Sequence, residues 1–161
     1  MKDIRLLTPD DIDVRIQSVN SGGARLLLYK NARVDMNILD ETVGSSNWQR
    51  EHYECKGNLF CRVGIWQNNA WVWKSDCGTE SNTEKEKGQA SDSFKRACFN
   101  IGIGRELYSA PFIWVNASDC NMRQYNGKWS TYDRFEVVDI TIENKRITGL
   151  AIRNTKTGSI V

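Results

Sequence analysis

The fold of this chain is decided by residues 90–101, which read ASDSFKRACFNI. A helix turns by about 100° per residue, so this stretch gathers its small and apolar side chains onto one arc. The residues on that arc are Ala90, Phe94, Ala97, Cys98 and Ile101. Lys95 and Arg96 then lie on the other side, and a solvated helix face with Asp92 one turn earlier as an ion partner explains the same pair. The pattern predicts an amphipathic helix that buries one arc and turns a basic pair outward.

The expected helix covers residues 83–101. Thr83 and Glu86 have the spacing of a capping box, in which the Thr hydroxyl accepts from a free backbone N–H and the Glu side chain accepts from the cap's own N–H. Gly102 and Gly104 are expected to end the helix, because glycine readily adopts the left-handed conformation found at helix ends.

The chain before this helix has the patterns of a hairpin and a second, shorter helix. Residues 14–18 and 25–29 are strand-like runs, and the segment between them, residues 20–23, reads NSGG and suits a turn. Over residues 32–43 the apolar positions recur at mostly four-residue spacing. This spacing predicts a short helix packed on the first hairpin.

Further strand patterns flank the long helix. Residues 48–67 and 70–79 predict two long strands, and residues 134–142 and 146–153 predict a C-terminal hairpin. The chain is therefore expected to have an α+β fold, in which an antiparallel sheet of β-hairpins is packed by one long helix.

Charge is nearly balanced, because the chain has 22 Lys and Arg and 20 Asp and Glu, which give a formal net charge of +2. A nucleic-acid site would therefore have to come from local patches. Residues 14–34 contain four cations and no Asp or Glu, as contacts to phosphates require. An ordinary solvated strand face explains the same pattern. The four cations are Arg15, Arg25, Lys30 and Arg33.

Other chemistries leave less trace in the sequence. No phosphate-binding loop of the type GxxxxGK[ST] occurs, and the five cysteines include no CxxC pair. The lone histidine, His52, lies in a polar run and receives no role. Four carboxylates would suit a metal-dependent nuclease, which is kept as an alternative function. They are Glu80, Glu84, Glu86 and Asp92.

The chain has six tryptophans, which are many for 161 residues. Trp71 and Trp73 are two apart on an expected strand, so they share one face of its sheet. Packing against the helix or against a neighbouring subunit is favoured over base stacking. Exposed hairpin edges also invite pairing with another copy, so the chain is expected to form a large oligomer.

Three motifs occur in one order with matching gaps: residues 39–48 read LDETVGSSNW, residues 76–80 read DCGTE, and residues 90–97 read ASDSFKRA. Together they resemble the annealing domain of the Rad fifty-two family, including its phage and prophage relatives. The resemblance spans residues 14–112. One difference is Phe99, which stands near the place where the eukaryotic pattern has a further arginine.

The resemblance implies a ring of subunits that holds single-stranded DNA in an outer groove, with the phosphates inward and the bases exposed. It implies no cofactor. Lys95 and Arg96 match the groove-lining pair of the family, and Lys87 matches a basic residue two turns earlier. Arg15 resembles an arginine of the other wall. With Arg33 from the acid-free segment, these residues are the expected DNA-binding set.

The resulting hypothesis is a DNA-annealing protein of recombination and repair that breaks no bond and uses neither ATP nor metal. Residues 1–112 would bind DNA and oligomerise, and residues 113–161 would form a β-rich extension of the same domain. A bacterial or phage-infected cytoplasm is the expected location, with a single-strand-binding protein as a further partner. The alternatives are a metal-dependent nuclease and an interaction module that keeps the fold without the activity.

Overall fold

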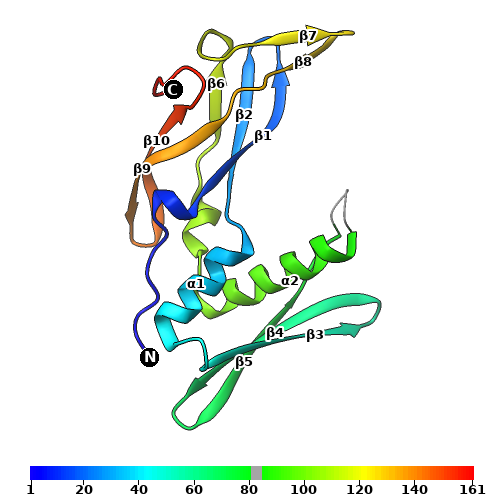
Figure 1. Ribbon diagram of the computed structural model, residues 1–161, viewed down its shortest axis with the longest axis vertical. Coiled ribbons are helices and arrows are strands. Elements are labelled where there is room, and N and C mark those ends of the chain that lie inside the picture. The colour runs from blue at the N-terminus through cyan, green and yellow to red at the C-terminus, as the bar shows by residue number, and fades with distance from the viewer. Residues whose placement is uncertain (81–84) are drawn as a thin grey trace. The chain divides into compact units, whose positions relative to one another are not determined.

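The computed structural model describes residues 1–80 and 85–161 and confirms a mixed α+β fold (Figure 1). The chain forms two compact units. Unit 1 contains Met1–Leu6 and Asn31–Arg105, and unit 2 contains Leu7–Lys30 and Glu106–Val161. The expected functional boundary at residue 112 stays a prediction. The compact units divide at other points, because the N-terminal hairpin belongs to the same sheet as strands from the second half of the chain.

Unit 1 is a three-stranded antiparallel sheet packed by the long helix. The strands follow the order β3-β4-β5, and helix α2 lies across one face of the sheet (Figure 1). The elements are α1 (Ala32–Val43), β3 (Trp48–Cys55), β4 (Asn58–Gln67), β5 (Ala70–Cys77) and α2 (Lys85–Ile101).

The apolar arc of α2 forms the centre of unit 1, as its sequence predicts. Phe94, Ala97 and Cys98 are fully buried. Successive side chains of β4 point to opposite faces of the sheet. Those on the face toward α2 are buried: Cys61, Val63 and Ile65. Gly102 has a φ of 122° directly after the helix. Thr83 lies outside the described residues, so the expected capping box stays a prediction.

Two expectations for unit 1 are wrong in detail. Residues 48–67 form two strands, because Lys56 and Gly57 both adopt positive φ and turn the chain. The stripe of α1 is buried, but its main contacts are with α2 and β3, whereas the first hairpin was expected as its partner. An apolar stripe predicts which side of a helix is buried, but it does not predict which element packs against that side.

The face of the sheet turned away from α2 carries aromatic side chains. Trp73 lies directly opposite Gly64, and a Cβ added at Gly64 would come within 2.8 Å of the Trp73 ring. The Arg62 guanidinium lies 4.3 Å from the centre of the same ring. Trp71 and Trp73 therefore do not pack against the helix, which was one of the two packings expected from the sequence. The outer aromatic face comprises Tyr53, Phe60, Trp66, Trp71 and Trp73.

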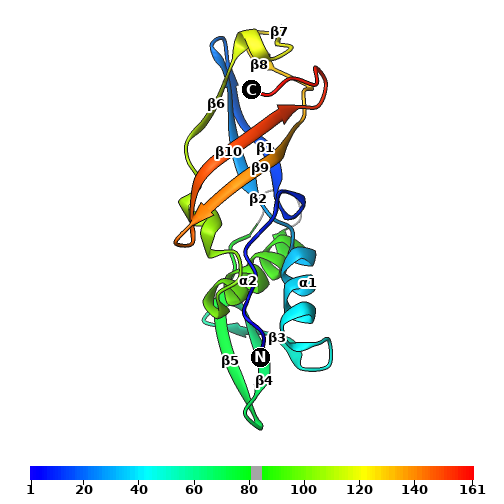
Figure 2. The ribbon, with the colours of Figure 1, turned by 90° about the vertical axis from the view of Figure 1, so that its left-hand side faces the viewer.

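Unit 2 is built on a five-stranded sheet with the order β10-β9-β1-β2-β6 (Figure 2). The N-terminal and C-terminal hairpins are confirmed. Strands β6, β7 and β8 were not predicted, and each has only three or four residues. The strands are β1 (Asp13–Asn20), β2 (Gly23–Tyr29), β6 (Ile113–Asn116), β7 (Arg123–Tyr125), β8 (Lys128–Ser130), β9 (Phe135–Glu143) and β10 (Arg146–Asn154), and the short 3-10 turns are Pro9–Asp11, Arg105–Ser109 and Ala117–Asp119.

A buried polar cluster holds the C-terminal part of unit 2 together. Asp133 is 4% exposed and accepts hydrogen bonds from the backbone and side chain of Asn121 and from the side chain of Asn154. Burial alone would raise the pKa of Asp133, but these hydrogen bonds outweigh it and lower the pKa below its usual value. Within the described chain, neither helix combines the length and apolar character needed to cross a membrane.

Candidate nucleic-acid interface

A hollow of about 520 Å³ opens in unit 1 where α1, β3 and α2 meet. Its lining includes three cationic side chains, and no Asp or Glu lines it among the described residues. The cations come from all three elements: Arg33 from α1, Arg50 from β3 and Lys87 from α2. The arrangement is therefore a concave site with a concentrated positive charge, which attracts anions.

The first turn of α1 forms one wall of the hollow. Asn31 caps this helix, because its side-chain oxygen accepts a hydrogen bond of 2.9 Å from the backbone N–H of Arg33. The start of a helix carries a partial positive charge, so it favours an anion at this wall. Arg33 is exposed at the same end of the helix and adds a full charge.

Strand β3 supplies the second wall. Arg50 and His52 are two residues apart, so both point to the face of the sheet that packs on α2. The Arg50 guanidinium lies 4.7 Å from the centre of the Phe94 ring. His52 Nδ1 lies 3.4 Å from Ser93 Oγ. Burial, together with the nearby charge of Arg50, lowers the pKa of His52 below 6.5.

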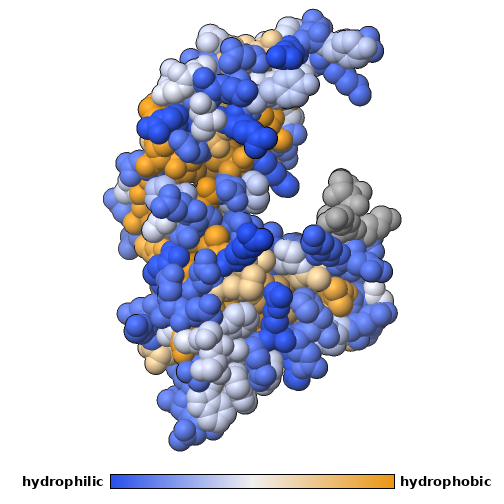
Figure 3. Space-filling view, viewed as in Figure 1, coloured by the Kyte–Doolittle hydropathy of each residue, from blue (hydrophilic) through white to orange (hydrophobic). Residues whose placement is uncertain are grey.

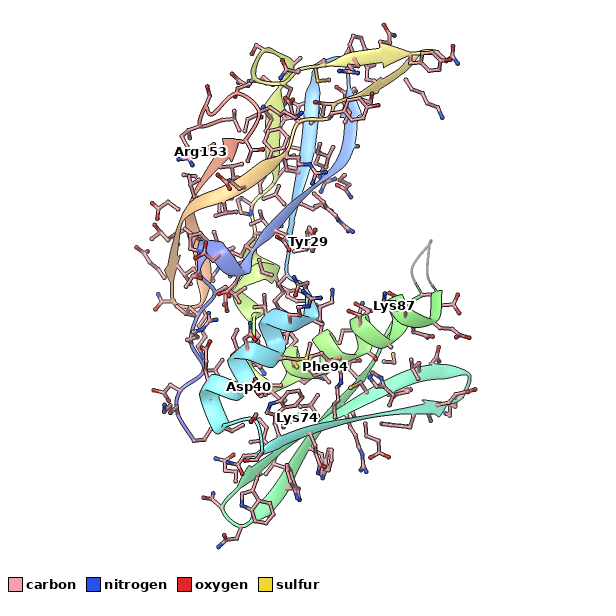
Figure 4. The ribbon with its side chains drawn as sticks, in the orientation of Figure 1. Tyr29, Asp40, Lys74, Lys87, Phe94 and Arg153 are labelled. Atoms are coloured by element: carbon pink, nitrogen blue, oxygen red, sulfur yellow. The ribbon has the colours of Figure 1, made fainter. Side chains whose placement is uncertain are left out.

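The third wall is the first half of α2, which contributes Lys87, Ala90 and Ser91. Lys87 is exposed, and Figure 4 labels it near the start of the described helix. The structure thus brings together two members of the expected DNA-binding set, Arg33 and Lys87, from separate elements.

The hollow also contains Arg50 and His52, which the sequence reasoning missed. Their two-residue spacing places them on one face of a strand that begins at Trp48. Trp48 belongs to the core side of the sheet, where its ring lies 6.1 Å from that of Phe94. This spacing relative to a half-buried tryptophan was the signal that could have found them.

Lys95 and Arg96 do not line the hollow. Both are half-buried on α2. Arg96 Nε donates to Asp92 Oδ2 at 2.9 Å, and the same carboxylate oxygen accepts from the backbone N–H of Thr79 at 2.9 Å. The ion-pair interpretation of this basic pair therefore holds for Arg96. A role in binding DNA stays a prediction for both residues.

Arg15 belongs to unit 2 and lies exposed on β1. Its guanidinium lies 5.9 Å from the centre of the Tyr29 ring. On the adjacent strand β2, Arg25 lies opposite Ser18 and is half-buried against Phe112, with 4.9 Å between the guanidinium and the ring centre. The acid-free segment is therefore divided: Arg15 and Arg25 lie on the sheet of unit 2, and Arg33 lies in the hollow of unit 1.

The carboxylates weighed for a nuclease are not assembled into a metal site within residues 1–80 and 85–161. No group of three or more His, Cys, Asp or Glu there has a geometry that could hold a metal ion. Asp92 is engaged by Thr79 and Arg96, and Glu84 lies outside the described residues.

No protein-family model, curated protein or solved structure matches this chain. The resemblance to the Rad fifty-two family accordingly stays a prediction.

Proposed function

We propose that this protein binds single-stranded DNA through the hollow of unit 1 and anneals complementary strands without ATP or a metal ion. The observation that carries the proposal is the convergence of Arg33, Arg50 and Lys87 on one concave site with no carboxylate in its described lining. Each phosphate contact by such a cation releases counterions and adds affinity that does not depend on sequence. The hollow suits a phosphate backbone because its surface is concave and its cations are held in place by three elements that pack together.

Annealing follows from holding a strand by its backbone. Phosphate contacts fix the position of the strand and leave its base edges unread, so the bases stay available for pairing. An immobilised strand has already lost much of the conformational entropy that pairing would otherwise cost. The protein then accelerates annealing without forming or breaking a covalent bond. Such an activity fits recombination and double-strand-break repair, next to a single-strand-binding protein that delivers the strand.

Assembly into a ring of like subunits is part of the proposal. β3 and β5 are the edge strands of the sheet in unit 1, and unpaired edges favour pairing between copies. The outer aromatic face adds an uncovered apolar area beside β5, where Trp66 is 42% exposed and Trp71 is 37% exposed. Arg62 and Glu51 on this face pair with each other at 2.6 Å, so their charges offset. An aromatic face of this kind suits a second copy of the chain better than a phosphate backbone.

The test is a comparison of single-stranded DNA binding between the Arg33→Ala/Lys87→Ala double variant and a matched control, Lys74→Ala. Lys74 is an exposed lysine of β5 outside the hollow, and Figure 4 labels it with Lys87. Fluorescence anisotropy with a labelled oligonucleotide in EDTA should show weaker binding for the double variant alone. The slope of log affinity against log salt should flatten by about 0.7 for each phosphate that the protein no longer neutralises.

The outcomes separate the competing functions. Strand annealing that persists in EDTA supports the proposal. Cleavage of the oligonucleotide that needs magnesium and disappears in Glu86→Ala would favour a nuclease. If the native protein fails to bind single-stranded DNA at all, the interaction module becomes the better interpretation.

A further inference from the structure

The β7–β8 hairpin of unit 2 lies outside the five-stranded sheet and forms a separate two-stranded sheet. Its turn is Asn126-Gly127, and both residues have positive φ, of 49° and 76°. This pair is the preferred sequence for a two-residue hairpin turn, because both positions require a left-handed backbone. The hairpin is thus built by its turn chemistry even though each strand has only three residues.

The two faces of this hairpin differ in composition. Trp129 pairs with Gln124 on one face and is half-buried, and β8 contacts β1 of the main sheet. The other face carries side chains that are all exposed. Arg123 opposes Ser130 there, and Tyr125 opposes Lys128. Trp129 therefore anchors the hairpin to unit 2, and the opposite face is left to solvent.

The exposed face alternates cations with aromatic rings. Tyr125 is 79% exposed, and Tyr132, two residues after β8, is 69% exposed. The Arg123 guanidinium lies 4.6 Å from the centre of the Tyr132 ring. Rings this exposed contribute little to a core, so folding alone does not account for them. In Figure 3 the tip of the hairpin is covered by hydrophilic and intermediate side chains.

The hairpin segment itself carries charge of one sign. Residues 120–132 contain Arg123 and Lys128 and no Asp or Glu. The next carboxylate, Asp133, is buried and held by Asn121 and Asn154, so it does not neutralise the exposed face. Two cations beside two flat rings match the two features of a single strand, which are its phosphates and its unstacked bases.

We propose that the β7–β8 hairpin is a second contact for single-stranded nucleic acid, in which bases stack on Tyr125 and Tyr132 and phosphates bind Arg123 and Lys128. Duplex DNA is excluded as the main ligand, because its bases are already stacked on one another. An acidic peptide would satisfy the cations and leave the rings without partners. The inference rests on the proposed function for its ligand, but it uses residues that the hollow does not contain.

The test compares hairpin variants with hollow variants in the full-length protein. Tyr125→Ala and Tyr132→Ala should each weaken binding of a single-stranded oligonucleotide by about tenfold, the usual effect of removing one stacked base. Tyr125→Phe should bind normally, since it keeps the ring. Lys145→Ala serves as the control, because Lys145 is an exposed lysine in the turn of the other C-terminal hairpin. Circular dichroism should show unchanged folding in every variant.

A second readout places the strand directly. Irradiation of an oligonucleotide containing 5-iodouracil should crosslink it to Tyr125 or Tyr132, and mass spectrometry identifies the residue. Normal binding by both alanine variants, with no crosslink in residues 123–132, overturns the hairpin site. Duplex DNA that competes as well as a single strand overturns it too.

The failure of this inference is distinguishable from failure of the proposed function. If Arg33→Ala/Lys87→Ala loses binding and the hairpin variants do not, the hollow stands and the hairpin site is wrong. If only the hairpin variants lose binding, the hairpin site stands and the hollow is wrong. If the native protein binds no single strand, both fail together.

Discussion

Arg96 Nε donates a hydrogen bond of 2.9 Å to Asp92 Oδ2, one turn earlier on α2. The same oxygen accepts from the backbone N–H of Thr79, just after β5. One carboxylate thus ties the end of the sheet to the helix and holds a cation that the family resemblance assigns to DNA. Part of the basic face of α2 is therefore used for folding.

Replacing Asp92 by Asn should reduce the free energy of unfolding at pH 7 by about 1 kcal/mol, because the acceptor for Thr79 and Arg96 is weakened. Burial acts to raise the pKa of Asp92, but hydrogen bonds from Thr79 and Arg96 lower it below 3.8. A lowered carboxyl pKa gives stability that is present above the unfolded pKa and lost as pH falls through the folded one. Urea denaturation should therefore show the difference shrinking below about pH 4. An equal difference at all pH values would contradict the role of the charge.

The Lys95→Ala/Arg96→Ala double variant should bind single-stranded DNA more weakly and equally so for all sequences, with a smaller salt slope. Arg96→Ala alone should have less effect than Lys87→Ala, because Arg96 already shares its charge with Asp92. Anisotropy titrations at several salt concentrations measure both effects. Normal binding by the double variant at about 0.15 M salt would remove this part of α2 from the interface.

Binding of single-stranded DNA should strengthen as pH falls below 6.5. The pKa of His52 is lowered by burial and by Arg50, so His52 is neutral at pH 7 and gains its charge only in more acidic solution. Arg33, Arg50 and Lys87 line the same hollow, so a protonated His52 adds to the positive charge there. His52→Gln should bind with an affinity that stays constant between pH 5 and 7.5, where the native protein changes. A native affinity that is also constant would place the phosphates away from His52.

Light scattering without DNA should report a mass many times 18.4 kDa. Trp66→Ala/Trp71→Ala should lower that mass, because both rings lie exposed on the outer aromatic face. Tyr108→Ala removes another exposed ring, from unit 2, and should leave the mass unchanged. A native protein that is monomeric at micromolar concentration, with and without single-stranded DNA, would end the ring model.

The fold was predictable wherever one periodic pattern covers a whole element. The arc from Ala90 to Ile101 predicts α2 and its buried side, and the alternation around Val63 predicts a strand with one buried face. Short elements carry too little pattern: β7 and β8 have three residues each, and only the pair Asn126-Gly127 marks their turn. The turn at Lys56-Gly57 was not predicted, because lysine seldom adopts positive φ and the residues on both sides continue a strand pattern.

The candidate site was only partly predictable, because charge in a sequence says nothing of which cations converge. Arg33 and Lys87 meet in one hollow, and Arg15 belongs to the other unit. Arg50 and His52 lie in a polar run that is typical of a solvated strand. Arg50 lies beside Phe94 because β3 packs on α2. The two-residue spacing from Trp48 predicts which face of β3 carries Arg50 and His52, but it does not predict which element covers that face.

The close approach of Gly64 and Trp73 has a consequence for the evolution of this chain. The indole ring lies where a side chain at position 64 would begin, so any larger residue at 64 displaces the ring. Relatives with an aromatic residue at 73 should therefore have glycine at 64. Relatives with a small residue at 73 should tolerate a larger residue at 64. Positions 64 and 73, which pair across β4 and β5, are therefore expected to covary. This covariation would arise from the packing of the two side chains and would not depend on what the protein binds.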